Sequence, residues 1–252
     1  MILRGPCAPP MQRPPSASLE IGSGVVADAR RALWLPEVRA LVIADTHFGH
    51  AWVERARGQL LPLGDGDAGL RVLFELLNDY RPRELVIAGD IVHATTSIHG
   101  VGEPLEELCR FCLENSVDLV LVLGNHDRGL ADMVSRLGLR VKVSSERRLG
   151  RFRIVHGDAP LGGVGAEEWV VMGHEHPCVT LRGAGNRSAR CPCFLMGQGT
   201  LVLPAFSSRA AGCTVESGRF LGPVASTRRF DCAVVCVGAR LLKLPLPLPA
   251  GA

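Results

Sequence analysis

The chain has 252 residues, of which 47% are hydrophobic, and this is enough to bury the core of one large domain or two small ones. No apolar run approaches the roughly 18 to 20 residues that a membrane-spanning helix needs, so we expect a soluble protein. The net charge is +3 and the basic residues are nearly all arginine, so charge alone identifies no class of partner.

The N-terminal residues carry five prolines and no continuous apolar segment, so they do not resemble a secretory signal. We expect residues 1–20 to form a disordered tail, with Met11 as an alternative start, and residues 21–252 to form a single domain. Nine cysteines are scattered, and Cys191-Pro192-Cys193 is spaced too closely for a zinc pair. Reduced thiols in a cytoplasmic protein are therefore expected.

The first half of the chain alternates predicted strands and helices. Short apolar pieces in residues 21–36 predict one or two edge strands. Continuous apolar runs predict three strands buried on both faces, at residues 40–44, 84–88 and 119–123. Apolar residues at helical spacing predict helices over residues 68–80 and 103–115. This succession indicates a right-handed, mostly parallel layer.

After Gly138 the pattern changes to short β pieces joined by tight links, which favours antiparallel strands of a second sheet. These antiparallel strands are expected at residues 141–143, 147–149 and 152–155, and further strands are expected at residues 169–172, 179–181, 194–196 and 201–203. Leucine and proline alternate in residues 242–249, which disfavours a central strand there. The whole pattern predicts an α/β fold with two sheets.

Polar residues follow the ends of five predicted strands. The five stretches are Asp45-Thr46-His47, Gly89-Asp90 with His93 three residues later, Gly124-Asn125-His126-Asp127, His156-Gly157-Asp158 and Gly173-His174-Glu175-His176. Taken alone, the first is typical of an aspartate turn with a surface histidine, and His93 suits a hydrogen-bonded loop histidine as well as a functional one. Six of the eight histidines lie in these stretches, however, and ligands bind beyond the carboxyl ends of strands in α/β sheets. The set therefore indicates one functional site.

The residue types in this set point to metal ions. Imidazole, carboxylate and amide donors without thiolates suit manganese, iron, zinc or nickel. The set offers more such side chains than one ion can bind. Two ions about 3.5 to 4 Å apart that share one carboxylate would use them all, and would clamp both the attacking and the leaving oxygen of a phosphoryl displacement.

In order, the five stretches resemble the motifs of calcineurin-like metallophosphoesterases, over residues 40–177. The resemblance implies a metallo-dependent phosphatase fold, a four-layer α/β/β/α sandwich of two mixed β-sheets flanked by helices. It implies two divalent ions, with manganese expected and iron, zinc or nickel as alternatives. One ion would be held by Asp45, His47, Asp90 and His176, and the other by Asp90, Asn125, His156 and His174.

The resemblance also implies roles for residues that are not ligands. His126 would contact the scissile phosphate beside Asn125 and protonate the leaving oxygen, and Asp127 would orient His126. In related nucleases a histidine at the position of His93 assists phosphodiester cleavage. His93 is therefore a further catalytic candidate.

Finer features are similar to a subgroup, the bacterial and archaeal ligase-associated phosphoesterases (PdeM-like), which are relatives of DNA-repair nucleases. These features are Phe48-Gly49-His50, Arg55-x-Arg57-Gly58, Pro192-Cys193-Phe194-Leu195 and residues 201–206. They make His50 and Arg57 candidate substrate contacts, although lysine commonly stands where this chain has His50. The similarity implies a DNA substrate and a functional association with a DNA ligase and a helicase.

Three hypotheses about function follow. The first is a metal-dependent phosphodiesterase, a DNA nuclease linked to DNA repair. The second is a phosphomonoesterase or protein phosphatase on the same metal centre, because the motifs fix the phosphorus chemistry and leave the substrate to the loops. The third is a non-catalytic scaffold. An arginine-rich strip (Arg147, Arg148, Arg151 and Arg153) is either a solvated strand face or a DNA track.

Overall fold

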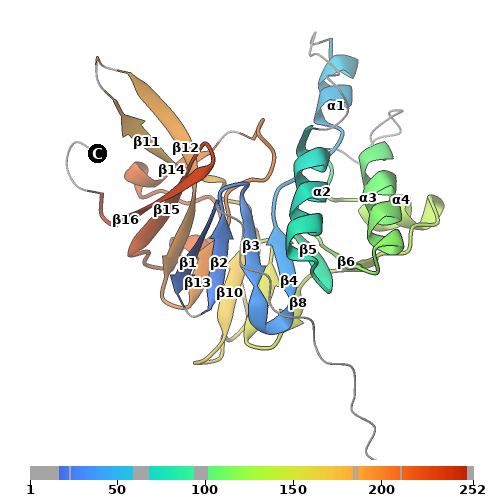
Figure 1. Ribbon diagram of the computed structural model, residues 1–252, viewed down its shortest axis with the longest axis horizontal. Helices are drawn as coiled ribbons and strands as arrows, with labels where there is room; N and C mark the ends of the chain where they lie inside the picture. The colour runs from blue at the N-terminus through green and yellow to red at the C-terminus, as the bar shows by residue number, and fades with distance from the viewer. Residues whose placement is uncertain are drawn as a thin grey trace, which may run out of the picture.

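The computed structural model describes residues 17–22, 24–58, 68–93, 102–183, 185, 187–210 and 212–248. Two mixed β-sheets pack face to face, and the longer helices cover the outer face of the first sheet (Figure 1). The predicted tail falls outside the described residues as far as residue 16. Residues 18–20, which we assigned to that tail, belong to the first strand.

The first sheet has seven strands in sequence order. They are β1 (Ser18–Gly22), β2 (Val25–Asp28), β3 (Ala32–Leu35), β4 (Ala40–Ile43), β5 (Glu84–Ala88), β6 (Asp118–Val122) and β7 (Lys142–Ser144). The first three pair antiparallel, β3 pairs antiparallel with β4, and β4 to β7 run parallel. The predicted parallel layer is therefore confirmed for the strands at residues 40–44, 84–88 and 119–123.

Helices connect the strands of this sheet. The α-helices are α1 (His50–Ala56), α2 (Ala68–Tyr80), α3 (Glu103–Glu114) and α4 (Leu130–Arg136), and a short 3-10 helix, η1, spans Pro36–Val38. The helices predicted at residues 68–80 and 103–115 correspond to α2 and α3. Helices α1 and α4 were not predicted from the sequence, because each is only seven residues long.

The second sheet has nine strands in the order β14-β11-β12-β13-β10-β9-β8, and β15 pairs with β12 and β16. Its strands are β8 (Arg147–Leu149), β9 (Phe152–Val155), β10 (Trp169–Met172), β11 (Pro177–Arg182), β12 (Ser188–Gly197), β13 (Thr200–Val202), β14 (Cys213–Thr214), β15 (Cys232–Val237) and β16 (Arg240–Pro245). The outer face of this sheet is covered by the short helices η2 (Val215–Ser217) and α5 (Pro223–Ser226) and by loops.

Two details of the predicted second sheet were wrong. The strand expected at residues 141–143 joins the first sheet, where β7 runs parallel to β6 after a crossover through α4. The predicted antiparallel pairing is confirmed for β8 with β9, but β9, β10 and β13 are parallel to one another, so the second sheet is mixed rather than antiparallel. The links around them are long enough for crossovers, which allow parallel pairing even where the strands themselves are short.

Successive side chains of the parallel strands point to opposite faces of the sheet. Both faces are buried, which explains why these sequences are apolar throughout. In β4, Leu41 and Ile43 pack under the helices, whereas Ala40 and Val42 pack against the second sheet. Strands β5 and β6 divide their side chains between the same two cores. Both faces of this part of the sheet are thus buried, as is usual for parallel strands.

Three further features concern the C-terminal strand, the helices and the cysteines. Strand β16 pairs only with β15 among the described strands, in agreement with the leucine and proline pattern. No helix in the described part of the chain is long and apolar enough to cross a membrane. The eight cysteines that the structure describes are all free thiols.

The arginine-rich strip is paired with carboxylates. Arg147 binds Glu84 through two hydrogen bonds of 2.7 Å. The other three pair with acidic residues as well: Arg148 with Glu146 and Glu168, Arg151 with Glu37, and Arg153 with Glu146. Glu84 begins β5, whereas the polar stretch at Asp90 follows its end. The strip therefore neutralises acidic residues at the far edge of the sheet, which favours a structural role over a DNA track.

Candidate metal centre

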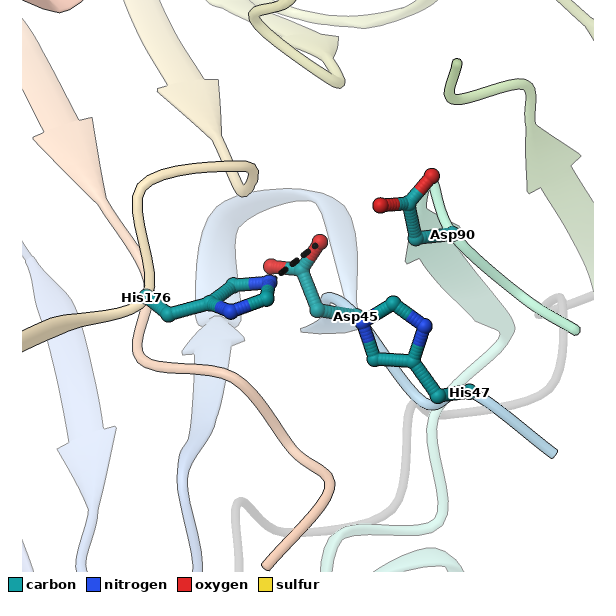
Figure 2. A group of neighbouring side chains, drawn as sticks. All are labelled: Asp45, His47, Asp90 and His176. Carbon is teal, nitrogen blue, oxygen red and sulfur yellow. Dashed lines mark ion pairs between the residues drawn. The ribbon is translucent and has the colours of Figure 1, made fainter. Parts of the chain in front are cut away.

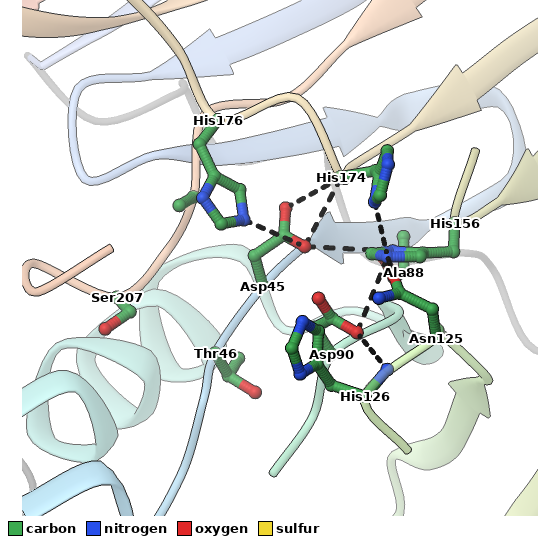
Figure 3. A network of polar contacts seen from close by, with 12 residues as sticks. Asp45, Thr46, Ala88, Asp90, Asn125, His126, His156, His174, His176 and Ser207 are labelled. Atoms are coloured by element: carbon green, nitrogen blue, oxygen red, sulfur yellow. Dashed lines mark hydrogen bonds and ion pairs between the residues drawn. The ribbon is translucent and has the colours of Figure 1, made fainter. Parts of the chain in front are cut away.

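The polar stretches meet at one edge of the sandwich, and both sheets contribute to it (Figure 3). From the first sheet come Asp45 and His47 after β4, Asp90 after β5, and Asn125 and His126 after β6. From the second sheet come His156 after β9, and His174 and His176 after β10. Parallel strands place their carboxyl ends side by side, so residues far apart in sequence become neighbours.

Backbone hydrogen bonds hold the loops after β4 and β5 together. The His47 amide donates to the Asp90 carbonyl oxygen (2.9 Å), and the Phe48 amide donates to that of Ile91 (2.8 Å). The His93 amide in turn donates to the Phe48 carbonyl oxygen (3.0 Å). These bonds extend the parallel pairing of the two strands beyond their ends, so the polar side chains of both loops have fixed relative positions.

Many of the candidate ligands have an unusual backbone conformation. Positive φ angles occur at Asp45 (55°), His47 (45°), Asp90 (48°), His174 (69°) and His176 (46°). Residues with a Cβ rarely adopt this left-handed region, which costs free energy and occurs preferentially at functional sites. The surrounding hydrogen bonds must outweigh that cost, and the result is that these side chains point into one space.

One group of donors consists of Asp45, His47, Asp90 and His176 (Figure 2). Each offers one donor atom, and these atoms all lie within 4.8 Å of one another. The His47 Nδ1 atom is buried and has no hydrogen-bond partner among the described residues. Burial lowers the pKa of His47 to about 4, against the attraction of the Asp45 and Asp90 carboxylates, so this imidazole is neutral at pH 7. A neutral imidazole is the form that binds a metal ion.

A second group of donors converges on His156, whose ring is 1% exposed. Its Nδ1 atom lies 3.1 Å from the Ala88 carbonyl oxygen, to which it can donate. Three other atoms that can serve as metal ligands surround its Nε2 atom: Asn125 Oδ1 at 3.2 Å, His174 Nδ1 at 3.2 Å and Asp90 Oδ1 at 3.5 Å (Figure 3). Asp90 thus belongs to both groups.

The electrostatics of the second group favour a positive charge at its centre. Burial lowers the pKa of His156, but its contacts with Asp90 and Asp45 outweigh burial and raise the pKa to about 9. Burial raises the pKa of Asp90, yet the His156 contact and the His126 amide bring it down to about 2. The protein alone therefore attracts a proton where these donors meet. A divalent ion satisfies the same donors with more charge, so the residues fit metal ions.

His126 and Asp127 differ in what they contact. The His126 amide donates to Asp90 Oδ1 (3.0 Å), and its exposed side chain has its ring centroid 6.1 Å from that of His47. Asp127 is 3% exposed and accepts hydrogen bonds from three backbone amides, those of Ile91, Val92 and Gly124. Both of its oxygens are used by these amides. These contacts tie the loops after β5 and β6 together, and the orientation of the His126 ring by Asp127 stays a prediction.

The remaining predicted site residues form a separate cluster beside His47. The ring centroids of His50 and His93 are 4.3 Å apart, and those of His47 and His93 are 5.8 Å apart. The guanidinium of Arg57 pairs with Glu54 (2.8 Å), and none of the described contacts of Arg57 is with a residue of the two donor groups. Glu54 also lies 3.5 Å from His93 Nε2. Burial lowers the pKa of both His50 and His93.

The sequence patterns missed two buried carboxylates. Glu54 stands one helical turn after His50, and this spacing could have indicated that the two share a helix face. Glu175 lies between two candidate ligands, is 0% exposed, and accepts hydrogen bonds from the amides of Leu221 (2.6 Å) and Gly222 (2.8 Å). It fixes a distant loop against the metal centre, a contact that no local pattern reveals.

Comparisons with known proteins agree with this geometry. The family model for calcineurin-like phosphoesterases matches residues 38–192, which include all of the candidate ligands. Among solved structures, the nuclease MPE from Pseudomonas putida has 27% sequence identity and a TM-score of 0.64, and the match covers 90% of this chain and 98% of that chain. A search of curated proteins found no match.

Proposed function

This chain belongs to the calcineurin-like phosphoesterases, a family of phosphoester hydrolases, and we propose that it is a metal-dependent phosphodiesterase that cleaves DNA. The observation that supports this most is that two groups of donors share Asp90 at the edge of the sandwich. The nuclease activity named for the similar Pseudomonas putida protein favours a diester over a monoester.

In this proposal two divalent ions occupy the two donor groups. Asp45, His47, Asp90 and His176 would hold one, and Asp90, Asn125, His156 and His174 the other. When bound, the ions would supply Lewis acidity that stabilises negative charge on the oxygens around phosphorus. Nitrogen and oxygen donors without thiolates suit manganese, and also iron, zinc or nickel.

The residues beside the ions handle the substrate. Asn125 and His126 are exposed at the rim, so both can contact the scissile phosphate, and the His126 ring can protonate the leaving oxygen. The bond from the His126 amide to Asp90 places the ring next to the shared carboxylate. His93 lies beside His47 without belonging to either donor group, and it would assist the reaction from there.

A cavity of about 810 Å³ next to His47 is the place for the rest of the substrate. His50 lines this cavity, and so do Arg31 and Arg209. A polynucleotide has negative charge on both sides of the scissile bond, so cationic side chains along the path are suitable neighbours. The function extends to DNA repair in association with a DNA ligase and a helicase, for which genes adjacent to this one would be supporting evidence.

The substrate class can be tested with two synthetic esters. The purified protein should be made metal-free, reloaded with Mn²⁺, and assayed with bis(4-nitrophenyl) phosphate and 4-nitrophenyl phosphate. We expect faster turnover of the diester, cleavage of single-stranded DNA, and loss of both activities in Asp90→Asn. A preference for the monoester would instead favour a phosphomonoesterase or protein phosphatase, and inactivity with every divalent metal would favour a scaffold.

Replacement of His126 tests its role as the acid. In His126→Ala we expect kcat to fall by about 10²- to 10⁴-fold, the usual contribution of a positioned acid or base. Metal content should remain unchanged, because the only described contact with Asp90 uses the backbone amide. Elemental analysis alongside the assay separates the two effects. Loss of metal in this variant would show that the His126 side chain supports the ligands instead.

A further inference from the structure

A third group of metal-ligand side chains lies outside the seven candidate ligands. His50, Glu54 and His93 each offer one donor atom, and these atoms all lie within 4.8 Å of one another. None of the three contributes a donor atom to either of the groups described above. The cluster is a compact set of two imidazoles and one carboxylate.

The fold holds these three side chains in place. His50 and Glu54 are four residues apart on α1, so they lie on the same face of that helix. His93 reaches the same point from the loop after β5, where its amide is bonded to the Phe48 carbonyl oxygen (3.0 Å). The cluster therefore joins two segments that are distant in sequence, and its geometry does not depend on one flexible loop.

The polar atoms of the cluster are incompletely satisfied by the protein. The His50 Nδ1 atom is buried and has no hydrogen-bond partner among the residues that the structure describes. Glu54 is only 9% exposed, and its distance of 3.5 Å from His93 Nε2 is long for a hydrogen bond. A buried polar atom without a partner costs free energy, so a ligand that binds all three side chains would stabilise this arrangement.

We propose that His50, Glu54 and His93 bind a third divalent transition-metal ion. Two imidazoles and one carboxylate are a donor set that suits zinc in particular, and manganese or nickel as well. Three protein ligands leave at least one position open for water or for an oxygen of another ligand. His50 also lines the cavity of about 810 Å³, which gives an ion a path from solvent.

Arg57 competes with an ion for Glu54. Its guanidinium donates to Glu54 Oε1 (2.8 Å), but the side chain is 62% exposed. Exposed ion pairs contribute little to stability, and this side chain can turn into solvent when an ion displaces it. The Glu54 carboxylate also has a second oxygen, for which no contact with Arg57 is described.

The position of this ion gives it a distinct use. His93 and His47 are in edge-to-face contact, so the third ion would lie next to the two-ion centre without sharing a ligand with it. It would add positive charge at the cavity, where it can bind a phosphate neighbouring the scissile one. This use, unlike the binding of the ion, rests on the proposed nuclease function.

Metal counting tests the site independently of activity. The full-length protein should be made metal-free with a chelator and dialysed to equilibrium against Zn²⁺, and separately against Mn²⁺, with bound metal measured by elemental analysis. For at least one metal we expect three ions per chain in the wild type and two in Glu54→Gln. The matched control Glu75→Gln, an exposed glutamate on α2, should keep three.

Further variants make the result unambiguous. His50→Gln should also bind two ions, and a circular dichroism melt checks that each variant is folded. Asp90→Asn should lose ions from the two-ion centre yet keep the one that depends on Glu54. The proposal is overturned if the wild type saturates at two ions with both metals, or if Glu54→Gln and His50→Gln both retain three. Inactivity toward phosphodiesters with three bound ions would refute the nuclease function but not this site.

Discussion

Around the candidate ligands, individual residues are packed so closely that the neighbouring backbone has no room for a side chain. A Cβ atom at Gly124 would lie 2.4 Å from Asp90 Oδ1, and one at Gly89 would lie 2.1 Å from His156 Nδ1. At Gly173 the nearest ligand atom, Asp45 Oδ2, would be 2.7 Å away. These distances are far below van der Waals contact, so the glycines of the motifs are required by the ligands that they face.

Gly124 offers the sharpest test of this close approach. In Gly124→Ala the added methyl group must displace Asp90, which belongs to both donor groups, so we expect metal affinity to fall by about 10- to 100-fold, as when support for a ligand is lost. Isothermal titration calorimetry with Mn²⁺ measures the change. Gly163→Ala is the control, because a Cβ there would meet no atom within 4 Å. Equal affinities in the two variants would contradict the argument.

This example shows what the sequence could and could not indicate at the residue scale. Repeated polar endings on strands were enough to single out Asp90 and its neighbours, because parallel strands bring their carboxyl ends together. The sequence could not show why residue 124 must be glycine. Its φ angle is ordinary, and the constraint comes from Asp90, which lies 34 positions earlier in the printed sequence. Contacts between residues so far apart in the sequence become visible only in the folded structure.

At the scale of elements, hydrogen bonds join the described parts of the loops that follow β4, β5 and β6. Asp127 is the main side-chain link, because its carboxylate joins the loop after β6 to the amides of Ile91 and Val92 after β5. Burial raises the pKa of Asp127 to about 6, although its backbone hydrogen bonds lower it. The carboxylate thus connects the loop with the shared ligand Asp90 to the loop with Asn125 and His126.

Substitution of Asp127 should therefore lower the stability of the fold more than it lowers kcat. In Asp127→Asn one oxygen acceptor becomes a donor that faces a backbone amide, and an unsatisfied buried group costs about 1–3 kcal/mol. Urea denaturation of the metal-free protein should show a loss of this size, whereas Asp132→Asn, on the exposed face of α4, should show almost none. Unchanged stability with a large fall in kcat would instead support a role in orienting His126.

Element prediction succeeded for the two longer helices and for several strands, including short ones such as β8 and β9, but it missed the seven-residue helices. Strands β4, β5 and β6 and helices α2 and α3 were evident because buried strands and amphipathic helices have different periods. Helix α4 was missed, and with it the crossover that places β7 in the first sheet. Helix α1 was missed as well, so the neighbourhood of His50 and Glu54 could not be anticipated.

At the scale of the whole molecule, the metal centre connects the two sheets. Asp45, Asp90 and Asn125 come from the first sheet, and His156 and His174 come from the second. Direct contacts already cross this boundary, among them His156 Nε2 to Asn125 Oδ1 and the His174 amide to Asp45 Oδ2 (3.1 Å). Ions held at this boundary would bind the native state and have no such site in the unfolded chain.

Removal of metal should consequently lower the melting temperature. An ion present at 100 times its dissociation constant stabilises the native state by about 2.7 kcal/mol, which corresponds to a shift of about 5–10 °C for a chain of this size. Differential scanning calorimetry with saturating Mn²⁺ and with EDTA, at one pH and ionic strength, measures this difference. Asp90→Asn should show a smaller difference, because it loses the ions of the two-ion centre. An unchanged wild-type melting temperature would argue against resident ions.

The order of the chain along the two sheets has a consequence for biosynthesis. Residues 18–144 supply every strand of the first sheet, and all strands of the second sheet follow from residue 147 onward. A nascent chain emerging from the ribosome can therefore complete its first sheet while it still lacks His156, His174 and His176. A chain that stops before His174 would be unable to assemble either donor group in full. Neither donor group can therefore bind its ion with all of its ligands until residues 174 and 176 have been synthesised.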